Sequence, residues 1–143
     1  ALGVIKRGAE RDVVGLALVA ARAAQGDLPV PLCVVQGATD AVVAPVNGAQ
    51  LARQYLALNG HPALGEGEAT ALPPPDEQFE TQEGERRLTR SDWKMKGRLV
   101  VRHWLVDGLG HAWSGGDAAL PFNDGAPPDA TALLGAFVRE VGS

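Results

Sequence analysis

The sequence contains a single cysteine, Cys33, so no disulfide can form within the chain, and cysteine content does not identify a redox compartment. Long hydrophobic runs are also missing. The longest run extends from Val13 to Ala21 and falls well short of the roughly 20 apolar residues that span a bilayer. Basic residues are outnumbered, with thirteen Lys and Arg against seventeen Asp and Glu, and the formal net charge is −4. We therefore expect no membrane partner and no nucleic acid partner.

Groups of metal ligands are absent as well. The three histidines, His61, His103 and His111, and the one cysteine are too widely separated to match the spacing of zinc ligands. The sequence therefore predicts no metal site, and we expect no cofactor. The first residues include neither an initiator methionine nor the zones of a signal peptide, so we expect the beginning of the natural protein to be missing.

The composition that is present is that of a globular protein, with 45% hydrophobic and 21% charged residues. At 143 residues the chain is long enough for one hydrophobic core and too short for two. We therefore expect a single domain over residues 1–143. Within it, residues 61–84 are rich in Pro, Glu and Gly and have little apolar periodicity, which predicts a mobile surface excursion.

Hydrophobic periodicity predicts helices and strands on both sides of that excursion. A helix is expected over residues 9–25, with Gly26 as its C-cap. The continuous apolar run at 30–35 predicts a strand buried on both faces of a parallel sheet. The remaining expected elements are a helix capped by Asn47 and stopped at Asn59-Gly60, two extended segments at 87–93 and 98–106 around a tight turn, and a last helix opened by Pro127, Pro128 and Asp129.

Two loops carry residues with catalytic chemistry, and each follows a predicted strand. Asp40 follows the strand at 30–35, and His111 lies in a glycine-rich loop after the strand at 98–106. Ligands of open α/β sheets bind beyond the carboxyl ends of the strands. The sequence therefore predicts that both loops open onto the same rim, with the Asp40 carboxylate within about 2.6 to 3.2 Å of the His111 imidazole.

These loops also resemble those of a known family. The segment Gly37-Ala38-Thr39-Asp40-Ala41-Val42-Val43-Ala44-Pro45-Val46-Asn47 resembles the G-x-x-D-x-x-V-x-P-x-N segment of the polyhydroxybutyrate depolymerase-like esterases, and Gly108-Leu109-Gly110-His111-Ala112-Trp113-Ser114-Gly115-Gly116 resembles their histidine loop. The closing segment from Asn123 to Thr131 is also similar, although Ala126-Pro127 replaces the usual Gly-Pro. The likeness covers roughly residues 29–138. It implies the C-terminal part of an α/β-hydrolase, with a mostly parallel sheet flanked by helices and with the early strands and the nucleophile elbow absent.

The resemblance implies roles for three residues. Asp40 would be the acid of a catalytic triad and His111 the general base, because an imidazole can carry a proton from the nucleophile to the leaving group while a carboxylate orients it. Trp113 could wall the acyl or alcohol pocket. The alternatives are structural: Asp40 as a turn residue, His111 as a loop residue and Trp113 as a large core or rim residue. His61 and His103 have no catalytic context.

The third member of such a triad has no counterpart in the sequence. A serine nucleophile requires a G-x-S-x-G elbow, and the 143 residues contain none. The serines are Ser91, Ser114 and Ser143, and Ser114 follows the histidine, which is the wrong order. Cys33 lies within an apolar strand, where a buried structural thiol is the better interpretation.

The sequence therefore predicts part of a carboxylic ester hydrolase that is inactive on its own. Family resemblance implies hydroxyalkanoate polyesters or their short oligomers as the ester substrate, with acetyl xylan or feruloyl esters as the enzymatic alternative. The alternative from another class is a non-catalytic, self-associating module. An apolar sheet edge without its neighbouring strands would favour a homodimer, or association with the missing N-terminal half.

Overall fold

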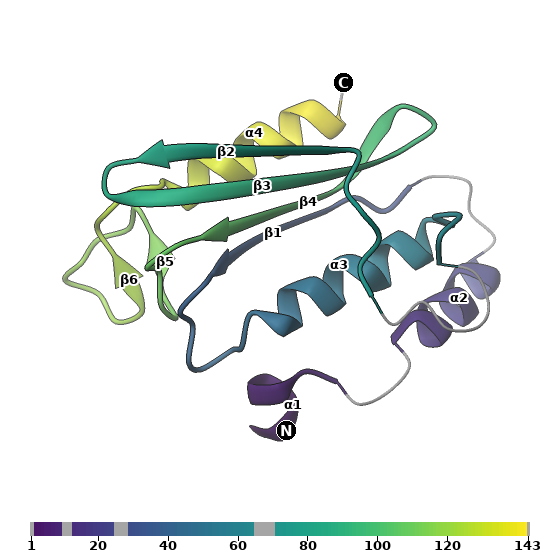
Figure 1. Ribbon diagram of the computed structural model, residues 1–143, viewed down its shortest axis with the longest axis horizontal. Helices are drawn as coiled ribbons and strands as arrows, with labels where there is room; N and C mark the ends of the chain where they lie inside the picture. The colour runs from purple at the N-terminus through teal and green to yellow at the C-terminus, as the bar shows by residue number, and fades with distance from the viewer. Residues whose placement is uncertain (1, 10–12, 25–28, 65–70, 143) are drawn as a thin grey trace.

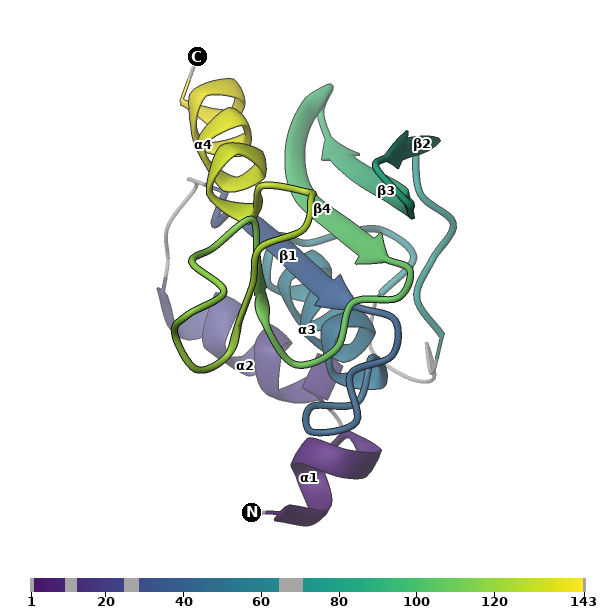
Figure 2. The same cartoon turned by 90° about the vertical axis from the view of Figure 1, so that its left-hand side faces the viewer.

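The computed structural model describes residues 2–9, 13–24, 29–64 and 71–142. A central sheet separates its helices into two groups (Figures 1 and 2). Helix α3 packs on one face of the sheet and is itself covered by α2, whereas α4 lies on the other face. The elements are α1 (Leu2–Arg7), α2 (Val13–Ala24), β1 (Leu32–Gly37), α3 (Val46–Leu58), β2 (Glu77–Glu83), β3 (Arg86–Met95), β4 (Arg98–Val106), β5 (Trp113–Ser114), β6 (Asn123–Asp124) and α4 (Ala130–Val141).

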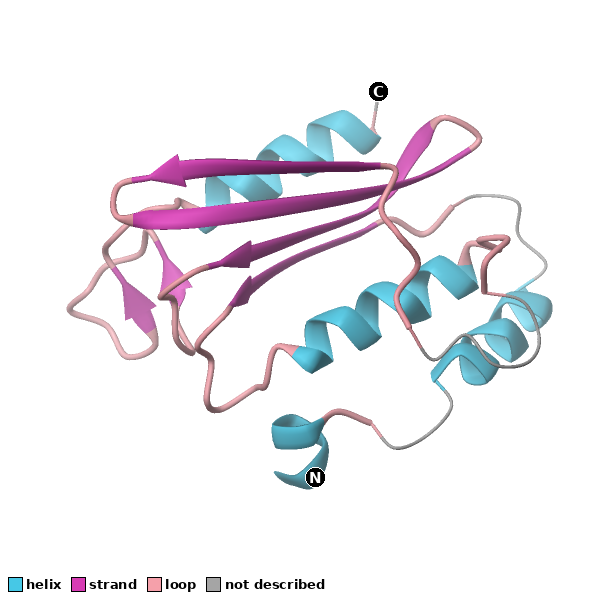
Figure 3. Cartoon of the chain, viewed as in Figure 1, coloured by secondary structure: helices cyan, strands magenta, loops and turns pink. Residues whose placement is uncertain are grey.

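The main sheet has the strand order β1-β4-β3-β2 and is mixed (Figure 3). Within the described part of this sheet only β1 and β4 are parallel, whereas β4 with β3 and β3 with β2 are antiparallel. The prediction of a mostly parallel sheet flanked by helices was therefore wrong. Two-residue turns connect β2 to β3 at Gly84-Glu85 and β3 to β4 at Lys96-Gly97. Such short connections join only antiparallel neighbours.

Strand β2 is a long strand of the main sheet that the sequence pattern did not reveal. It lies inside residues 61–84, which we expected to be a surface excursion, and residues 65–70 of that excursion lie outside the described residues. Its sequence is polar, and its one aromatic residue, Phe79, is packed over the guanidinium of Arg90 on β3. The same excursion contributes the carbonyl of Pro73, which accepts a hydrogen bond from the buried indole of Trp93.

The predicted helices are present with changed ends. The helix expected at 9–25 is α2, and its expected first residues at 10–12 and its cap Gly26 lie outside the described residues. Helix α3 begins at Val46 after Pro45, so Asn47 is not its N-cap. The Asn47 amide instead donates to the carbonyls of Ile5 and Ala44, at 2.8 and 3.0 Å, and ties α1 to the loop before α3. Asp129 caps α4 by accepting from the Ala132 amide.

Apolar side chains fill both sides of the sheet. Between the sheet and helices α2 and α3 lie Val14, Ala17, Ala52, Leu56, Ala57, Leu64, Trp93, Val100 and Val101. Beneath α4 a second cluster contains Leu88, Trp104, Val106 and Leu109. Within the described residues, no helix combines the length and the hydrophobicity needed to cross a membrane.

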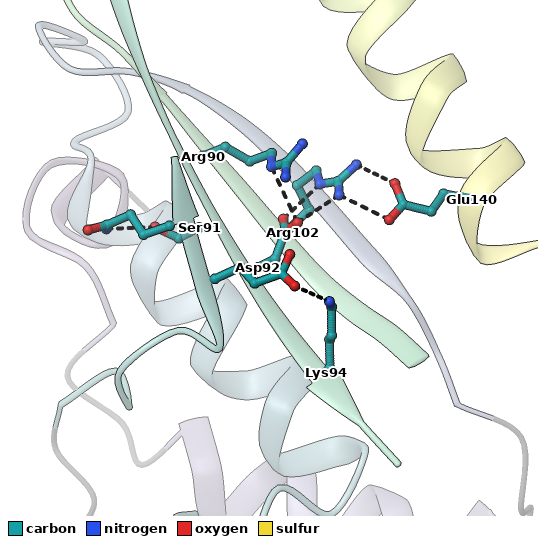
Figure 4. A network of polar contacts seen from close by, with 8 residues as sticks. Arg90, Ser91, Asp92, Lys94, Arg102 and Glu140 are labelled. Atoms are coloured by element: carbon teal, nitrogen blue, oxygen red, sulfur yellow. Dashed lines mark hydrogen bonds and ion pairs between the residues drawn. The ribbon is translucent and has the colours of Figure 1, made fainter. Parts of the chain in front are cut away.

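A buried ionic network also lies on the α4 face (Figure 4). The guanidinium of Arg102 on β4 forms two 2.7 Å hydrogen bonds to the Asp92 carboxylate on β3. The same guanidinium reaches Glu140 on α4 at 2.8 Å, and Arg90 lies 3.3 Å from Asp92. These contacts join β3, β4 and α4, because the carboxylates from β3 and α4 both bind the guanidinium of Arg102.

Candidate active site

The candidate site is built from the loops that follow β1 and β4. These strands are parallel and in register, with Gly37 opposite Val106, so their carboxyl ends reach the same edge of the sheet. The loops are joined directly, because the amides of Ala38 and Thr39 donate to the carbonyls of Val106 and Leu109 at 2.9 and 3.1 Å. The expectation that both loops share one rim is confirmed.

Gly37 allows the two loops to approach so closely. A Cβ atom at this position would lie 2.3 Å from the carbonyl oxygen of Leu109 and 2.6 Å from that of Gly110. Both contacts are with backbone, which cannot rotate away as a side chain would. A residue without a side chain is therefore required where the end of β1 passes beneath the histidine loop.

The two loops bring Asp40 and His111 together. The imidazole Nδ1 of His111 lies 2.9 Å from Oδ2 of Asp40, which confirms the distance expected from the sequence. The other carboxylate oxygen, Oδ1, accepts from the amides of Val42 and Val43 at 2.9 and 2.8 Å. The Asp40 side chain is 7% exposed and that of His111 is 39% exposed. A fixed, buried carboxylate therefore holds an imidazole that faces solvent.

The charge state of Asp40 follows from these contacts. Burial would raise the pKa of the carboxyl group, but the hydrogen bond from His111 and the amides of Val43 and Val42 outweigh burial and lower the pKa below its usual value. Asp40 is therefore ionised at neutral pH and can only accept hydrogen bonds. The proton between the two groups belongs to Nδ1, which leaves Nε2 as the ring nitrogen that can take up another proton.

Gln36 supports the acid loop from inside, a role that sequence reasoning missed. Its buried side-chain amide donates to the carbonyls of Gly37 and Val43, at 3.2 and 3.3 Å, and so links the two ends of the loop that carries Asp40. The sequence feature that could have indicated this role is an amide side chain at the end of an otherwise apolar strand.

A cleft of about 360 Å³ opens beside the imidazole. Trp113 lines it, is 47% exposed, and donates through its indole to Thr131 at 3.3 Å. Phe122, which sequence reasoning also missed, contributes a second aromatic ring. The lining residues are mostly apolar around the acid and histidine pair: Val35, Gln36, Gly37, Asp40, Val43, Gly110, His111, Ala112, Trp113 and Phe122.

Comparison with known families finds a match for the first half of the chain. The family model described as esterase PHB depolymerase matches residues 1–71. Over these residues the chain is similar to the PHB depolymerase esterases. The match indicates a carboxylesterase-like hydrolase and agrees with the resemblance found in the motifs. No curated protein matches the chain.

The match to the PHB depolymerase esterases covers only part of the candidate site. Residues 1–71 include Asp40, its loop and the amides that hold it, and they end before β3, β4 and the loop of His111. The family therefore accounts for the acid loop, whereas the position of the histidine rests on its motif and on its contact with Asp40.

A nucleophile of the kind an esterase requires is not found among the described residues of the cleft. Ser114 is buried in β5, and Ser91 lies on β3, where its hydroxyl accepts from the Gln78 amide. Ser143 lies outside the described residues. Burial raises the pKa of the Cys33 thiol to about 11, although nearby Arg102 opposes this, so the thiol is protonated at neutral pH and is a poor nucleophile.

The other two histidines lie away from the cleft. The ring of His61 accepts a 3.3 Å hydrogen bond from the Ala63 amide within a local turn. His103 faces Gly48 of α3 beneath the sheet, and burial lowers its pKa. Over the described ranges, no three His, Cys, Asp or Glu side chains are grouped so that they could hold a metal ion.

Proposed function

We propose that this chain supplies the acid and the general base of a serine carboxylesterase, with Asp40 as the acid and His111 as the base. The observation that carries the proposal is the 2.9 Å contact between His111 Nδ1 and an Asp40 carboxylate whose other oxygen is fixed by two backbone amides. This arrangement orients the imidazole and stabilises it when it becomes positively charged.

The chemistry is acyl transfer in two steps. In the first step Nε2 of His111 takes the proton of a serine hydroxyl as its oxygen attacks the ester carbonyl, and then gives that proton to the departing alkoxide. In the second step the same nitrogen takes a proton from the water that attacks the acyl-serine, and it returns this proton to the serine oxygen as the acid leaves. Asp40 remains ionised throughout and holds the proton on Nδ1.

The serine is proposed to come from sequence beyond these 143 residues, because no G-x-S-x-G elbow occurs within them. The cleft beside His111 is where its hydroxyl would have to lie. The hydroxyl and its oxyanion donors would complete the site from the open side of the cleft.

We propose a hydroxyalkanoate polyester, or its short oligomers, as the substrate. The esterase PHB depolymerase family supports this choice. The cleft supports it as well, because aliphatic and aromatic side chains surround the imidazole. Trp113 is proposed to form part of the wall that the substrate contacts.

The partner of the chain is proposed to bind along β1, as either a second copy or the segment that carries the serine. In the described sheet, β1 is a terminal strand and pairs only with β4. A terminal strand offers unpaired backbone groups to another strand. The proposal includes no nucleic acid and no membrane partner, in keeping with the acidic net charge.

Hydrolysis of p-nitrophenyl butyrate tests this function. The 143-residue chain alone is expected to give no turnover above background, and the gene product that includes an elbow serine is expected to hydrolyse the ester and to react with a serine-directed phosphonate. Turnover by the chain alone that the phosphonate abolishes would contradict the proposal. A gene product without any elbow serine would instead favour a non-catalytic module.

A further inference from the structure

Phe122 occupies an unusual position for a large apolar residue. Its ring packs edge-on against the imidazole of His111, with 5.8 Å between the ring centroids and an interplanar angle of 75°. It lines the cleft and is nevertheless 72% exposed. The ring therefore gains little from burial within the described fold, although it touches the residue proposed as the general base.

The backbone holds Phe122 in this position at some cost. Its φ is +57°, a left-handed conformation that is uncommon for a bulky residue and cannot be explained by the packing of so exposed a ring. Three hydrogen bonds nearby maintain it: the Phe122 carbonyl accepts from the Trp113 amide at 2.8 Å, the Asn123 side chain donates to Pro121 at 3.1 Å, and the Gly116 amide donates to Asp124 at 3.1 Å.

The loop is also attached to the sheet. The guanidinium of Arg86 on β3 binds both carboxylate oxygens of Asp124, at 2.6 and 3.3 Å, and the carbonyl of Pro127 at 3.1 Å. This bidentate pair anchors the loop two residues beyond Phe122. The exposed ring is therefore supported from the backbone side, as a residue in a preformed ligand site would be.

The chemistry of ester cleavage indicates which part of a substrate would lie beside Phe122. The general base of acyl transfer returns its proton to the oxygen of the leaving alcohol, so that oxygen must come close to the imidazole. A side chain packed against the imidazole therefore borders the alcohol portion of the ester. The edge and face of a phenyl ring bind aliphatic chains through dispersion and loss of apolar surface to water.

We propose that Phe122 forms a subsite for the apolar alcohol portion of the ester and determines specificity for its length. The subsite rests on the proposed esterase function, because that function places the leaving alcohol beside His111. For a polyester this portion is the alkyl segment of the unit that leaves.

Binding of esters to the 143-residue chain tests the subsite without requiring hydrolysis. Methyl, butyl and hexyl acetate form a series in which only the alcohol grows, and ethyl acetate, butyrate and hexanoate form a series in which only the acyl group grows. Dissociation constants are measured from shifts of the His111 imidazole signals in NMR titrations of the wild-type chain, F122A, F122L and L120A. Leu120 is a matched control, because it is 56% exposed in the same loop and does not line the cleft.

We expect hexyl acetate to bind the wild-type chain at least about fivefold more tightly than methyl acetate, and F122A to lose that difference while binding methyl acetate unchanged. F122L should keep part of the difference and L120A all of it, and neither variant should alter the acyl series. Equal weakening of both series by F122A, or no effect on either, would overturn the subsite. Because hydrolysis is not measured, a failed subsite can be distinguished from a failed esterase function.

Discussion

Among single residues, Gly37 decides how closely the acid and histidine loops can approach. We predict that G37A separates them, because the added Cβ would lie 2.3 Å from the carbonyl oxygen of Leu109 and neither backbone can yield without moving a loop. The Nδ1–H signal of His111, observed by NMR, should lose the downfield position of a proton bonded to a carboxylate.

G110A is the matched control for this change. Gly110 lies in the same histidine loop, and a Cβ there would meet no atom within 4 Å. The Nδ1–H signal of His111 in G110A should therefore remain as in the wild-type chain. An unchanged Nδ1–H signal in G37A would show that the close approach of the two loops does not require a glycine at this position.

Protonation of Asp40 provides a second prediction. The folded state lowers the pKa of this carboxyl group below its usual value of 3.8, so ionised Asp40 stabilises the fold above about pH 4, and this stabilisation is lost as the pH falls through the lower, folded-state pKa. The free energy of unfolding of the wild-type chain, measured in urea, should therefore exceed that of D40N at neutral pH. The difference should shrink as the pH falls below 3.8; a difference that grows as the pH falls would contradict the prediction.

Among the secondary-structure elements, α4 depends on a charge buried in the sheet. Arg102 is 5% exposed and neutralises Asp92, which is 1% exposed, whereas Glu140 on α4 is 50% exposed. We predict that R102M lowers the free energy of unfolding by about 3–5 kcal/mol, because Asp92 is left buried with only the more distant Arg90. E140Q should cost less than about 1 kcal/mol, since solvent screens the exposed carboxylate.

Urea denaturation of a third variant separates charge from packing. In the R102M/D92L double variant the network no longer contains the buried carboxylate of Asp92, and most of the stability lost in R102M should return. If the free energy of unfolding of R102M lay within about 1 kcal/mol of the wild-type value, the network would not hold these elements together.

The same elements show how far the sequence could predict the fold. Strands β1 and β4 were predicted from their apolar runs, and α4 from its proline entry and apolar face, because burial in a core leaves a hydrophobic pattern. Strand β2 left none, since its sequence is polar and its position at the edge of the sheet requires no apolar alternation. The mostly parallel sheet was implied by the family resemblance, and the antiparallel pairing of β2 with β3 and of β3 with β4 contradicts it.

The candidate site was predicted in part for a similar reason. Asp40 and His111 are identifiable because their motifs are continuous in the sequence and their loops follow recognisable strands. Gln36 and Phe122 belong to no motif. They lie at the site because β1 and β4 pair in parallel and because the loop after β5 returns to the histidine, and no motif encodes either contact.

For the whole chain, we predict self-association at high micromolar concentration. Strand β1 ends the described sheet, and a second copy could pair with its outer edge by a two-fold axis. Light scattering should give a mass near twice the 14.9 kDa of one chain. A stable, folded monomer across this concentration range would contradict the prediction.

The role of Asp40 and His111 in ester hydrolysis is tested most directly by kcat for p-nitrophenyl butyrate, measured at neutral pH in the gene product that contains the serine. We expect D40N to lower kcat by about 10² to 10⁴-fold with little change in KM, because the amide neither fixes the Nδ1 proton nor stabilises the charged imidazole. D117N, a change in the exposed loop after the histidine, should leave kcat unchanged. A D40N enzyme whose kcat stays within about threefold of the wild type would show that Asp40 is not the acid of the triad.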